Sequence, residues 1–359
     1  MKPIVTRRTL LRTTALAGCG GALALFGRAQ DTAPTDDLVT KDAQSAIDRS
    51  LDFLSASQAA DGSYGDRNGT GNAAISALAG LAFLAAGHQP GRGRYGRNVS
   101  RITDYLVVRG KTGIGGYLQN ADPFLSHSAM YQHGFGALFL SEAHGTFHDP
   151  ERQAAVRDML EKAVALIVKS QNVQGGWRYE PKPGSADVSV TVAQLMALRA
   201  AKNAGIYVDK AAVDKCVEYI KGCRMNDGGF CYMKDQKQTG SMFPRSAAAV
   251  VGLYSAGIYE GDYIDKGLKY LMRFLPAGAK NNFDVRQDHY YYGHYYAALA
   301  MWTAGGNFWA EWFPAIRNEL LAKRNNQGVW DDFYGNPYAT AMAAIILQLP
   351  NNYLPIMQK

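Results

Sequence analysis

The sequence predicts an all-α protein in which six helical hairpins close into a ring. Three observations indicate this architecture: a turn with glycine and an aromatic residue recurs, an amphipathic segment precedes each turn, and a nearly apolar segment follows it. The aromatic residues of the six turns are Tyr64, Tyr117, Trp177, Phe230, Phe283 and Trp330. Their spacing of 47 to 60 residues is typical of a repeated helical hairpin.

The turn is clearest in SQNVQGGWRYEP, residues 170–181, and weaker copies read SQAADGSYGD, RMNDGGFCYM and RNNQGVWDDF. Glycine allows the backbone to reverse tightly, and many of the apolar segments also end in glycine. The residues assigned to these structural turns are Gln171, Gly175, Gly176, Trp177, Gly228, Gly229, Phe230, Gln327, Gly328 and Trp330.

The segment before each turn has one apolar stripe, as in ERQAAVRDMLEKAVALIVKSQ, where Val156, Met159, Leu160, Ala163 and Ile167 share a face. The segment after each turn, such as AAISALAGLAFLAAG or YYAALAMWTAGG, is apolar nearly all round. Such a helix, too short for a membrane span, must be surrounded by other helices. The last segment, AIILQLPNNYLP, stays apolar to its end, which favours a closed ring over an open solenoid.

The N-terminal 29 residues predict a secretory signal, with a basic start, an apolar middle and small residues at the end. Arg7 and Arg8 in TRRTLL resemble a twin-arginine signal, which carries folded proteins out of the cytoplasm. We favour cleavage after Ala29; the alternative is a lipoprotein modified at Cys19 in LAGC. The sequence therefore predicts a chain exported to the periplasm or cell surface. Its expected divisions are a signal (1–29), a linker (30–39) and one domain of six repeats (40–359).

Removing the signal also removes most of the positive charge. The chain carries a formal +7, of which the first 29 residues contribute +5, so the mature chain carries +2. Nucleic acid is therefore not an expected partner. Cys216, Cys223 and Cys231 remain and form no CxxC pair; we favour three buried thiols over a disulfide. No transmembrane segment is expected after the signal, and the oligomeric state is left open.

The repeated turns resemble the QW repeats of squalene–hopene cyclases, and residues 40–350 are similar to the prenyltransferase/squalene-cyclase α/α toroid superfamily. Within it, MYQHGFGALFLSEAHG and WRYEPKPGSADVSVTVAQLMAL resemble short exported members. The resemblance implies an (α/α)6 toroid with a central cavity. It also implies that the turns are structural, with Gln and Trp tying neighbouring outer helices together.

The resemblance also bears on catalysis. The acid motif of squalene–hopene cyclases reads DxDDTA, and its middle Asp protonates the alkene; here the matching stretch is DVSVTVAQLMAL. Asp187 and Thr191 align with the first Asp and the Thr, whereas Ser189 stands at the proton-donor position. A serine hydroxyl does not protonate an isolated alkene. Asp187 is kept as a candidate acid, and as a candidate N-cap of the inner helix. Protein prenyltransferases hold zinc through Asp, Cys and His, but QTGSMFPRSAAAV lacks Asp-x-Cys, so no metal and no cofactor is expected.

A polar residue recurs at one depth of five inner helices: His133, Thr191, Ser246, His294 and Thr340. Two interpretations stay open, a polar ring lining the cavity or side chains bonded to neighbouring helix backbones. His294 and His133 are the catalytic candidates, with Asp187. The candidate ligand-binding residues are His127, Ser189, Thr191, Asp288, His289, Tyr291, Tyr292, Tyr295, Asp331, Asp332 and Tyr334.

The expected function is to hold a small hydrophobic molecule or a glycan in the cavity of a squalene-cyclase-like toroid that lacks the usual proton donor. Two alternatives are a terpenoid or polyprenyl enzyme that uses another acid, and a glycan-active enzyme such as a polysaccharide lyase. Tyrosine faces suit a cation, whereas tyrosine and histidine can serve as acid and base.

Overall fold

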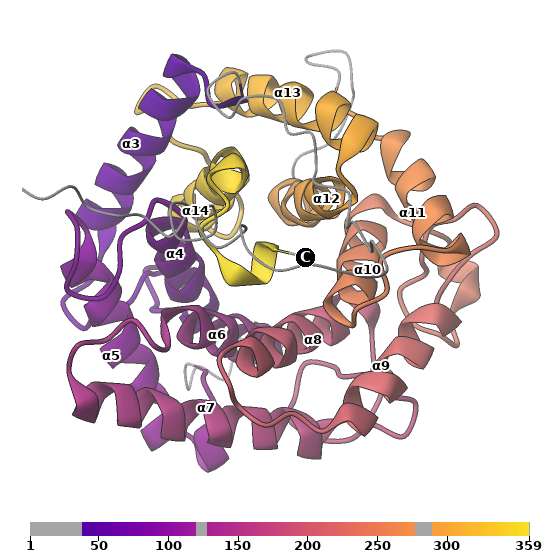
Figure 1. Cartoon of the computed structure of the whole chain (residues 1–359), viewed down its shortest axis with the longest axis horizontal. Coiled ribbons are helices and arrows are strands. Elements are labelled where there is room, and N and C mark those ends of the chain that lie inside the picture. Colours follow the sequence, from indigo (N-terminus) through magenta and orange to yellow (C-terminus); the bar gives the residue numbers. More distant parts are fainter. Residues whose placement is uncertain (1–37, 120–127, 277–288, 359) are drawn as a thin grey trace, which may run out of the picture. The chain divides into compact units, whose positions relative to one another are not determined.

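A computed structural model describes residues 38–119, 128–276 and 289–358 (Figure 1). By contacts the chain divides into residues 1–31 and 32–359, and all described residues belong to the second unit. The predicted signal and the candidates His127 and Asp288 lie outside the described residues, as does the turn residue Phe283.

The described residues form twelve α-helices and no named strand, which confirms the all-α prediction. The outer helices are α3 (Lys41–Ser57), α5 (Gly96–Thr112), α7 (Pro150–Ser170), α9 (Lys210–Gly222), α11 (Asp262–Met272) and α13 (Gly306–Ala322). The inner helices are α4 (Ala73–Ala85), α6 (Ala129–Ala143), α8 (Val188–Asn203), α10 (Phe243–Ser255), α12 (Tyr290–Ala304) and α14 (Asn336–Gln348). The two sets form concentric rings, as Figure 1 shows.

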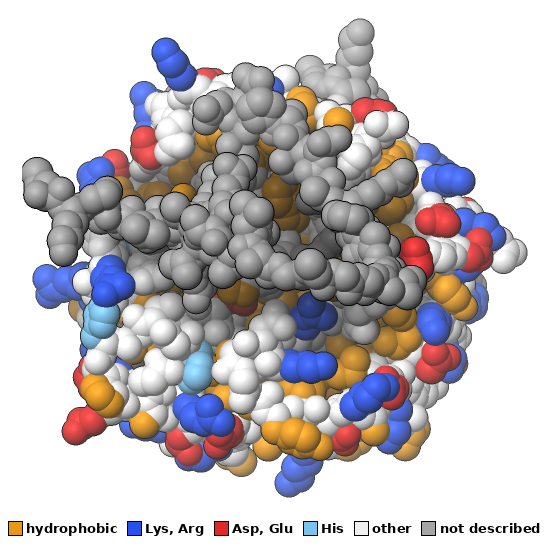
Figure 2. Space-filling view, in the orientation of Figure 1, with side chains coloured by type: hydrophobic (Ala, Val, Ile, Leu, Met, Phe, Trp, Pro, Cys, Tyr) orange, Lys and Arg blue, Asp and Glu red, His pale blue; other side chains and the backbone are white. Residues whose placement is uncertain are grey.

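Hydrophobic patterning explains this division. In α3 only one stripe is buried, whereas in α4 every residue except Ala74 is buried. A helix with one apolar stripe buries it against a neighbour and exposes its other face, but a helix apolar on all sides must be enclosed. In Figure 2 the charged side chains accordingly lie mostly around the perimeter, over the outer helices.

The ring is closed by contacts between its first and last repeats. Helix α14 packs on α3 and α4, and α13 packs on α3. Arg317 of α13 donates a hydrogen bond to the Leu38 carbonyl at 2.9 Å, and Arg324 pairs with Asp42 at 3.2 Å. The closed ring predicted from the apolar C-terminal segment is confirmed.

The recurring turns in the described part of the chain connect an outer helix to the next one. Gln171 Nε2 donates to the Ala212 carbonyl of α9 at 2.8 Å, and Trp177 Nε1 donates to the Ile167 carbonyl of α7 at 2.7 Å. Gly175 has a φ of +95°, and a Cβ there would collide with the backbone of Lys215 on α9. Glycine is therefore required both for the backbone conformation and for the close approach of the next helix.

Other turns use the same contacts with variations. Gly228 (φ +90°) packs on Lys266 of α11 as Gly175 packs on α9, and Trp330 Nε1 donates to the Leu320 carbonyl at 2.8 Å. Gln327 differs from Gln171. Its backbone N–H donates to Asn325 Oδ1 at 2.9 Å, whereas Gln171 donates through its side chain.

The C-terminal segment packs under the ring at the C-terminal ends of the inner helices. Gln348 and Asn351 donate to the carbonyls of Ala82 and Ala85 in α4, and Trp302 of α12 donates to the Met357 carbonyl at 3.0 Å. The side chain of Glu142 on α6 accepts from the Ile356 N–H at 3.4 Å. The bonds from Gln348 and Asn351 satisfy carbonyls that the C-terminal end of α4 leaves without intrahelical partners.

Two other expectations concern thiols and membranes. Cys216, Cys223 and Cys231 are buried free thiols, as favoured from the sequence. None of the helices described in the structure is both long and apolar enough to cross a bilayer.

Candidate functional site

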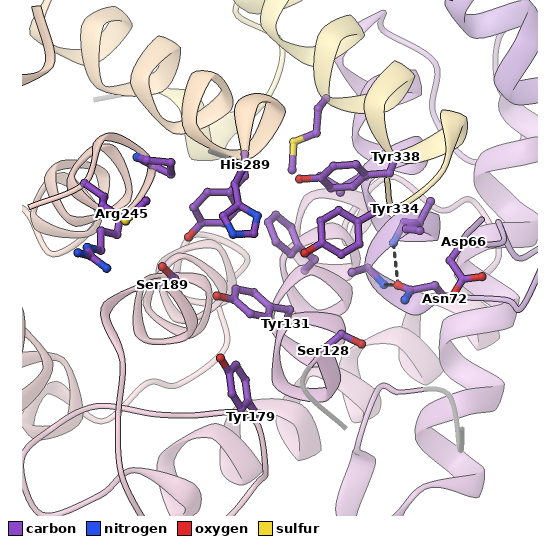
Figure 3. A pocket seen from close by; sticks show the side chains of 18 of the residues that line it. Asp66, Asn72, Ser128, Tyr131, Tyr179, Ser189, Arg245, His289, Tyr334 and Tyr338 are labelled. Carbon is purple, nitrogen blue, oxygen red and sulfur yellow. Dashed lines mark hydrogen bonds between the residues drawn. The ribbon is translucent and has the colours of Figure 1, made fainter. Parts of the chain in front are cut away.

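The site is a central pocket at the N-terminal ends of the six inner helices. Its volume is about 460 Å³, within the usual range for small-molecule sites. Its wall contains apolar side chains together with six tyrosines, Tyr131, Tyr179, Tyr232, Tyr292, Tyr334 and Tyr338. The polar residues that line it are Asp66, Asn72, Ser128, Ser189, Arg245 and His289. Figure 3 shows labelled side chains from separate repeats facing one common space.

The inner helices contribute equivalent positions to the pocket wall. One residue in the first turns of every inner helix lines it: Ala74, Tyr131, Ser189, Pro244, Tyr292 and Tyr338. Because all six helices point their N-termini towards the same end of the ring, their dipoles favour electron-rich groups there.

The recurring polar residues lie on the opposite face of these helices. Each stands two residues after the lining position, and two residues turn an α-helix by about 200°. Their side chains hold the turns. Thr191 Oγ1 accepts the Trp177 N–H at 3.0 Å, and Ser246 Oγ accepts the Phe230 N–H at 2.9 Å. Thr340 accepts from Trp330 in the same way at 3.4 Å.

His133 belongs to this structural set. Its Nδ1 accepts the Leu118 N–H at 3.1 Å, and its Nε2 lies 3.2 Å from the Ala163 carbonyl, which requires the neutral Nε2–H form. Burial lowers the pKa of His133 to about 4. His133 is not part of the pocket lining, and its contacts correspond to the second interpretation of this depth, a side chain bonded to neighbouring backbone.

His294 lies in an aromatic environment beside the outer helix α13. Its ring is 5.0 Å from Phe243, 4.4 Å from Tyr290 and 5.9 Å from Trp312. Burial, with the nearby Lys323 charge, lowers the pKa of His294 to about 3. His294 is absent from the pocket lining.

The other sequence candidates divide between wall and interior. Ser189, His289, Tyr292 and Tyr334 line the pocket. His289 has a φ of +49° and its ring stacks on Tyr334 at 6.5 Å. Tyr291 and Tyr295 are buried and are not part of the pocket lining. Asp331 and Asp332 are not part of it either and bond within their own turn: Asp331 accepts from the Asn325 side chain, and Asp332 accepts from the Tyr334 N–H.

Asp187 caps helix α8 and lies behind the pocket wall. Its Oδ1 accepts the Val190 N–H at 2.9 Å, as expected for an N-cap, and its side chain is fully buried. Burial raises the pKa of Asp187 to about 6, against opposing contributions from the Val190 N–H and the Arg178 charge.

The wall residues that the sequence analysis missed include Tyr131, Tyr179, Tyr232, Arg245 and Tyr338. Repeat spacing in the sequence could have identified two of them, because Tyr131 and Tyr338 stand two residues before the recurring polar residue, as the corresponding lining residues of other inner helices do. Tyr179 and Tyr232 follow the turns at the corresponding distance from Trp177 and Phe230. Among the described residues, no group of three or more His, Cys, Asp or Glu side chains is arranged to hold a metal ion.

Comparisons with known proteins agree with the fold. Residues 151–276 match the family described as prenyltransferase alpha-alpha toroid domain. One similar structure is an inactive variant of the alpha-1,6-mannanase GH76A of Salegentibacter sp. HEL1_6 in complex with alpha-1,6-mannotriose. It is 10% identical to this chain, with a TM-score of 0.60, and the match covers 86% of this chain and 97% of the mannanase chain. The type II terpene cyclase MstE from Scytonema is 13% identical with a TM-score of 0.58, covering 88% and 100%.

A variant of that cyclase in complex with geranylgeranyl dihydroxybenzoate is also 13% identical, with a TM-score of 0.58, covering 87% of this chain and 98% of that chain. No curated protein matches the chain. At these identities the similar structures show a shared fold, which confirms the α/α toroid expected from the repeats.

Proposed function

We propose, on the premise that this chain is an α/α toroid with a prenyltransferase-type domain, that it binds an elongated, mainly apolar ligand such as a terpenoid in its central pocket. The observation that carries the proposal is the composition of the wall. Ile75, Leu78, Phe135 and Met342 line it together with tyrosine rings, so an apolar body gains most by entering it. The polar residues at the helix N-termini favour an oxygen-bearing end.

We further propose that Ser189 occupies the position at which squalene–hopene cyclases carry their proton donor. The side chain of Ser189 lines the pocket two residues after Asp187, which supports this alignment. A hydroxyl at this position binds a polar group without protonating an alkene. The proposed role is therefore binding, or chemistry milder than alkene protonation.

A glycan-active function is the second candidate, favoured by the six tyrosines whose faces can pack on sugar rings. Glycoside hydrolysis usually requires two carboxyl groups on either side of the bond. Within the described part of the wall Asp66 is the single carboxylate. A terpenoid ligand is therefore favoured over hydrolysis of a glycan.

Filling the pocket tests the binding proposal. Ala74 lines the pocket, so Ala74→Trp is expected to weaken the binding of farnesol, a C15 isoprenoid alcohol, at least about tenfold. Ala211→Trp, in the exposed first turn of α9, is the matched control and should bind farnesol normally. Calorimetry measures both affinities, and mass spectrometry of molecules extracted from the native protein identifies the natural ligand. Undiminished binding by the folded Ala74 variant would contradict the proposed site.

We also propose export through the twin-arginine signal, with cleavage after Ala29. Arg7→Lys combined with Arg8→Lys is expected to leave uncleaved precursor in the cytoplasm, because the paired arginines are the recognised signal. Cell fractionation and intact-protein mass spectrometry measure location and N-terminus. Normal export of the double variant would exclude this route, and a lipid on Cys19 would exclude the Ala29 cut.

A further inference from the structure

The second carboxylate oxygen of Asp187 makes no hydrogen bond of normal length and angle. Oδ1 is used in the helix cap, but Oδ2 is buried, and the residue as a whole is 0% exposed. A buried carboxylate oxygen without a donor is unfavourable, because the loss of its hydration is not compensated. An acid held in this way is typical of a functional group.

The surroundings of Asp187 connect it to the pocket. Its carboxyl interacts electrostatically with one arginine and four tyrosines: Arg178, Tyr131, Tyr219, Tyr232 and Tyr292. Tyr131, Tyr232 and Tyr292 are themselves part of the pocket wall. The Tyr219 hydroxyl is already used, because it donates to the Ala186 carbonyl at 2.6 Å. Asp187 is therefore close to the tyrosines of the pocket wall, although it does not line the pocket itself.

Tyr232 lies between this acid and the cavity. Its hydroxyl oxygen is 2.6 Å from that of Tyr179, and its carbonyl accepts the Val188 N–H at 3.0 Å, which fixes it against the start of α8. The Arg178 guanidinium lies 4.8 Å from the Tyr179 ring and 5.6 Å from the Tyr232 ring. Burial raises the pKa of Asp187, and interactions with the Ser189 N–H and the Tyr232 side chain oppose this rise in part.

We propose that Asp187 and Tyr179 control a hydrogen bond that Tyr232 donates to an oxygen atom of the bound ligand. When Asp187 is protonated, its hydroxyl and that of Tyr179 both donate to the Tyr232 oxygen, which leaves the Tyr232 hydrogen free for the ligand. When Asp187 is ionised, Tyr232 donates to the carboxylate instead. A phenol oxygen can accept two hydrogen bonds while donating one, so the first arrangement uses its full capacity.

This inference rests on the proposed function for the identity of the ligand, and it adds that the ligand carries a hydroxyl or carbonyl oxygen at the helix N-termini. Tyr232 is the residue that touches the ligand, whereas Asp187 and Tyr179 position its hydrogen. Ligands with an oxygen acceptor should bind more tightly below the pKa of Asp187 than above it, whereas a hydrocarbon should bind equally at both pH values.

The first experiment needs no ligand. Carbon NMR of protein labelled at the aspartate carboxyl carbons, with Asp187→Asn to assign the signal, follows the titration of Asp187. Tyr232→Phe should raise its pKa, because the hydroxyl that stabilises the carboxylate is lost, and Tyr179→Phe should raise it less. Tyr338→Phe removes a pocket hydroxyl with no contact to Asp187 and should leave the pKa unchanged. An Asp187 signal unaffected by Tyr232→Phe would overturn the proposal.

The second experiment measures binding of farnesyl methyl ether, whose oxygen can only accept a hydrogen bond, and of farnesene, a hydrocarbon, at pH 5 and pH 7.5. The ether should bind about tenfold more weakly to the wild-type chain at pH 7.5, and Asp187→Asn or Tyr232→Phe should abolish this dependence. Binding of the ether with no pH dependence in the wild type would refute the inference. If neither compound binds, the proposed terpenoid function fails, while the NMR titration still decides whether Tyr232 controls Asp187.

Discussion

Trp177→Ala is expected to lower the free energy of unfolding by about 3–5 kcal/mol. The indole is buried between α7 and α8, and its Nε1–H donates to the Ile167 carbonyl at 2.7 Å. Truncation removes the packing of the ring and one of the two side-chain hydrogen bonds to that carbonyl, the other coming from the Ser170 hydroxyl at 3.1 Å. Urea unfolding followed by circular dichroism measures the loss.

The control is Tyr207→Ala, because Tyr207 is an aromatic residue that is 84% exposed and should change stability little. Trp330→Ala should behave like Trp177→Ala, since Trp330 makes the same hydrogen bond to Leu320. Farnesol affinity of the folded Trp177 variant should be retained, because Trp177 is not part of the pocket lining. A variant with wild-type stability but no binding would contradict the structural role.

Glu142→Gln is expected to stabilise the protein at pH 8 and above, by up to about 4–5 kcal/mol. Burial raises the pKa of Glu142 from 4.5 to about 8, opposed only by the hydrogen bond from the Ile356 N–H. The folded chain therefore binds the proton of Glu142 more tightly than the unfolded chain does. Its stabilising contribution is complete below pH 4.5 and is lost as pH rises towards 8. Glutamine retains the acceptor for Ile356 without a charge.

Thermal unfolding of the wild type and of Glu142→Gln across pH 4 to 9 measures this effect. The wild-type free energy of unfolding should fall relative to that of the variant between pH 4.5 and 8, and the curves should run parallel above that range. Glu311→Gln, on the exposed surface of α13, is the control and should change neither slope. Parallel curves throughout would show that Glu142 ionises freely in the folded chain.

The sequence sufficed for the fold because helix faces and turns repeat. Six copies of one hairpin reinforce one another where a single copy would be ambiguous. The last apolar segment, which contains Leu347, required a partner, and the first repeat could supply it. The candidate site was harder to predict because a buried helix is apolar on every side. Its pattern shows which residues share a depth, but it does not show which direction they face.

His133 and Thr191 illustrate the difficulty. Both stand at the recurring depth that the sequence indicates, but they face the turns, whereas their neighbours Tyr131 and Ser189 face the pocket. The polar character of His133 and Thr191 drew attention to the wrong face. Buried turn backbone needs donors and acceptors as much as a ligand does, so polarity alone does not distinguish the two uses.

Closure of the ring has a consequence for how the chain folds and fails to fold. The bonds that join Arg317 to Leu38 and Arg324 to Asp42 link residues 279 and 282 positions apart, so the last hairpin must be made before the first is complete. Ordering so long a loop carries an entropic cost and slows folding. A chain interrupted before α14 presents the uncovered flanks of α3 and α4 to solvent. A full-length chain whose last hairpin has not docked can place that hairpin on the same flank of a second chain, so we expect full-length chains that fail to close the ring to form domain-swapped dimers.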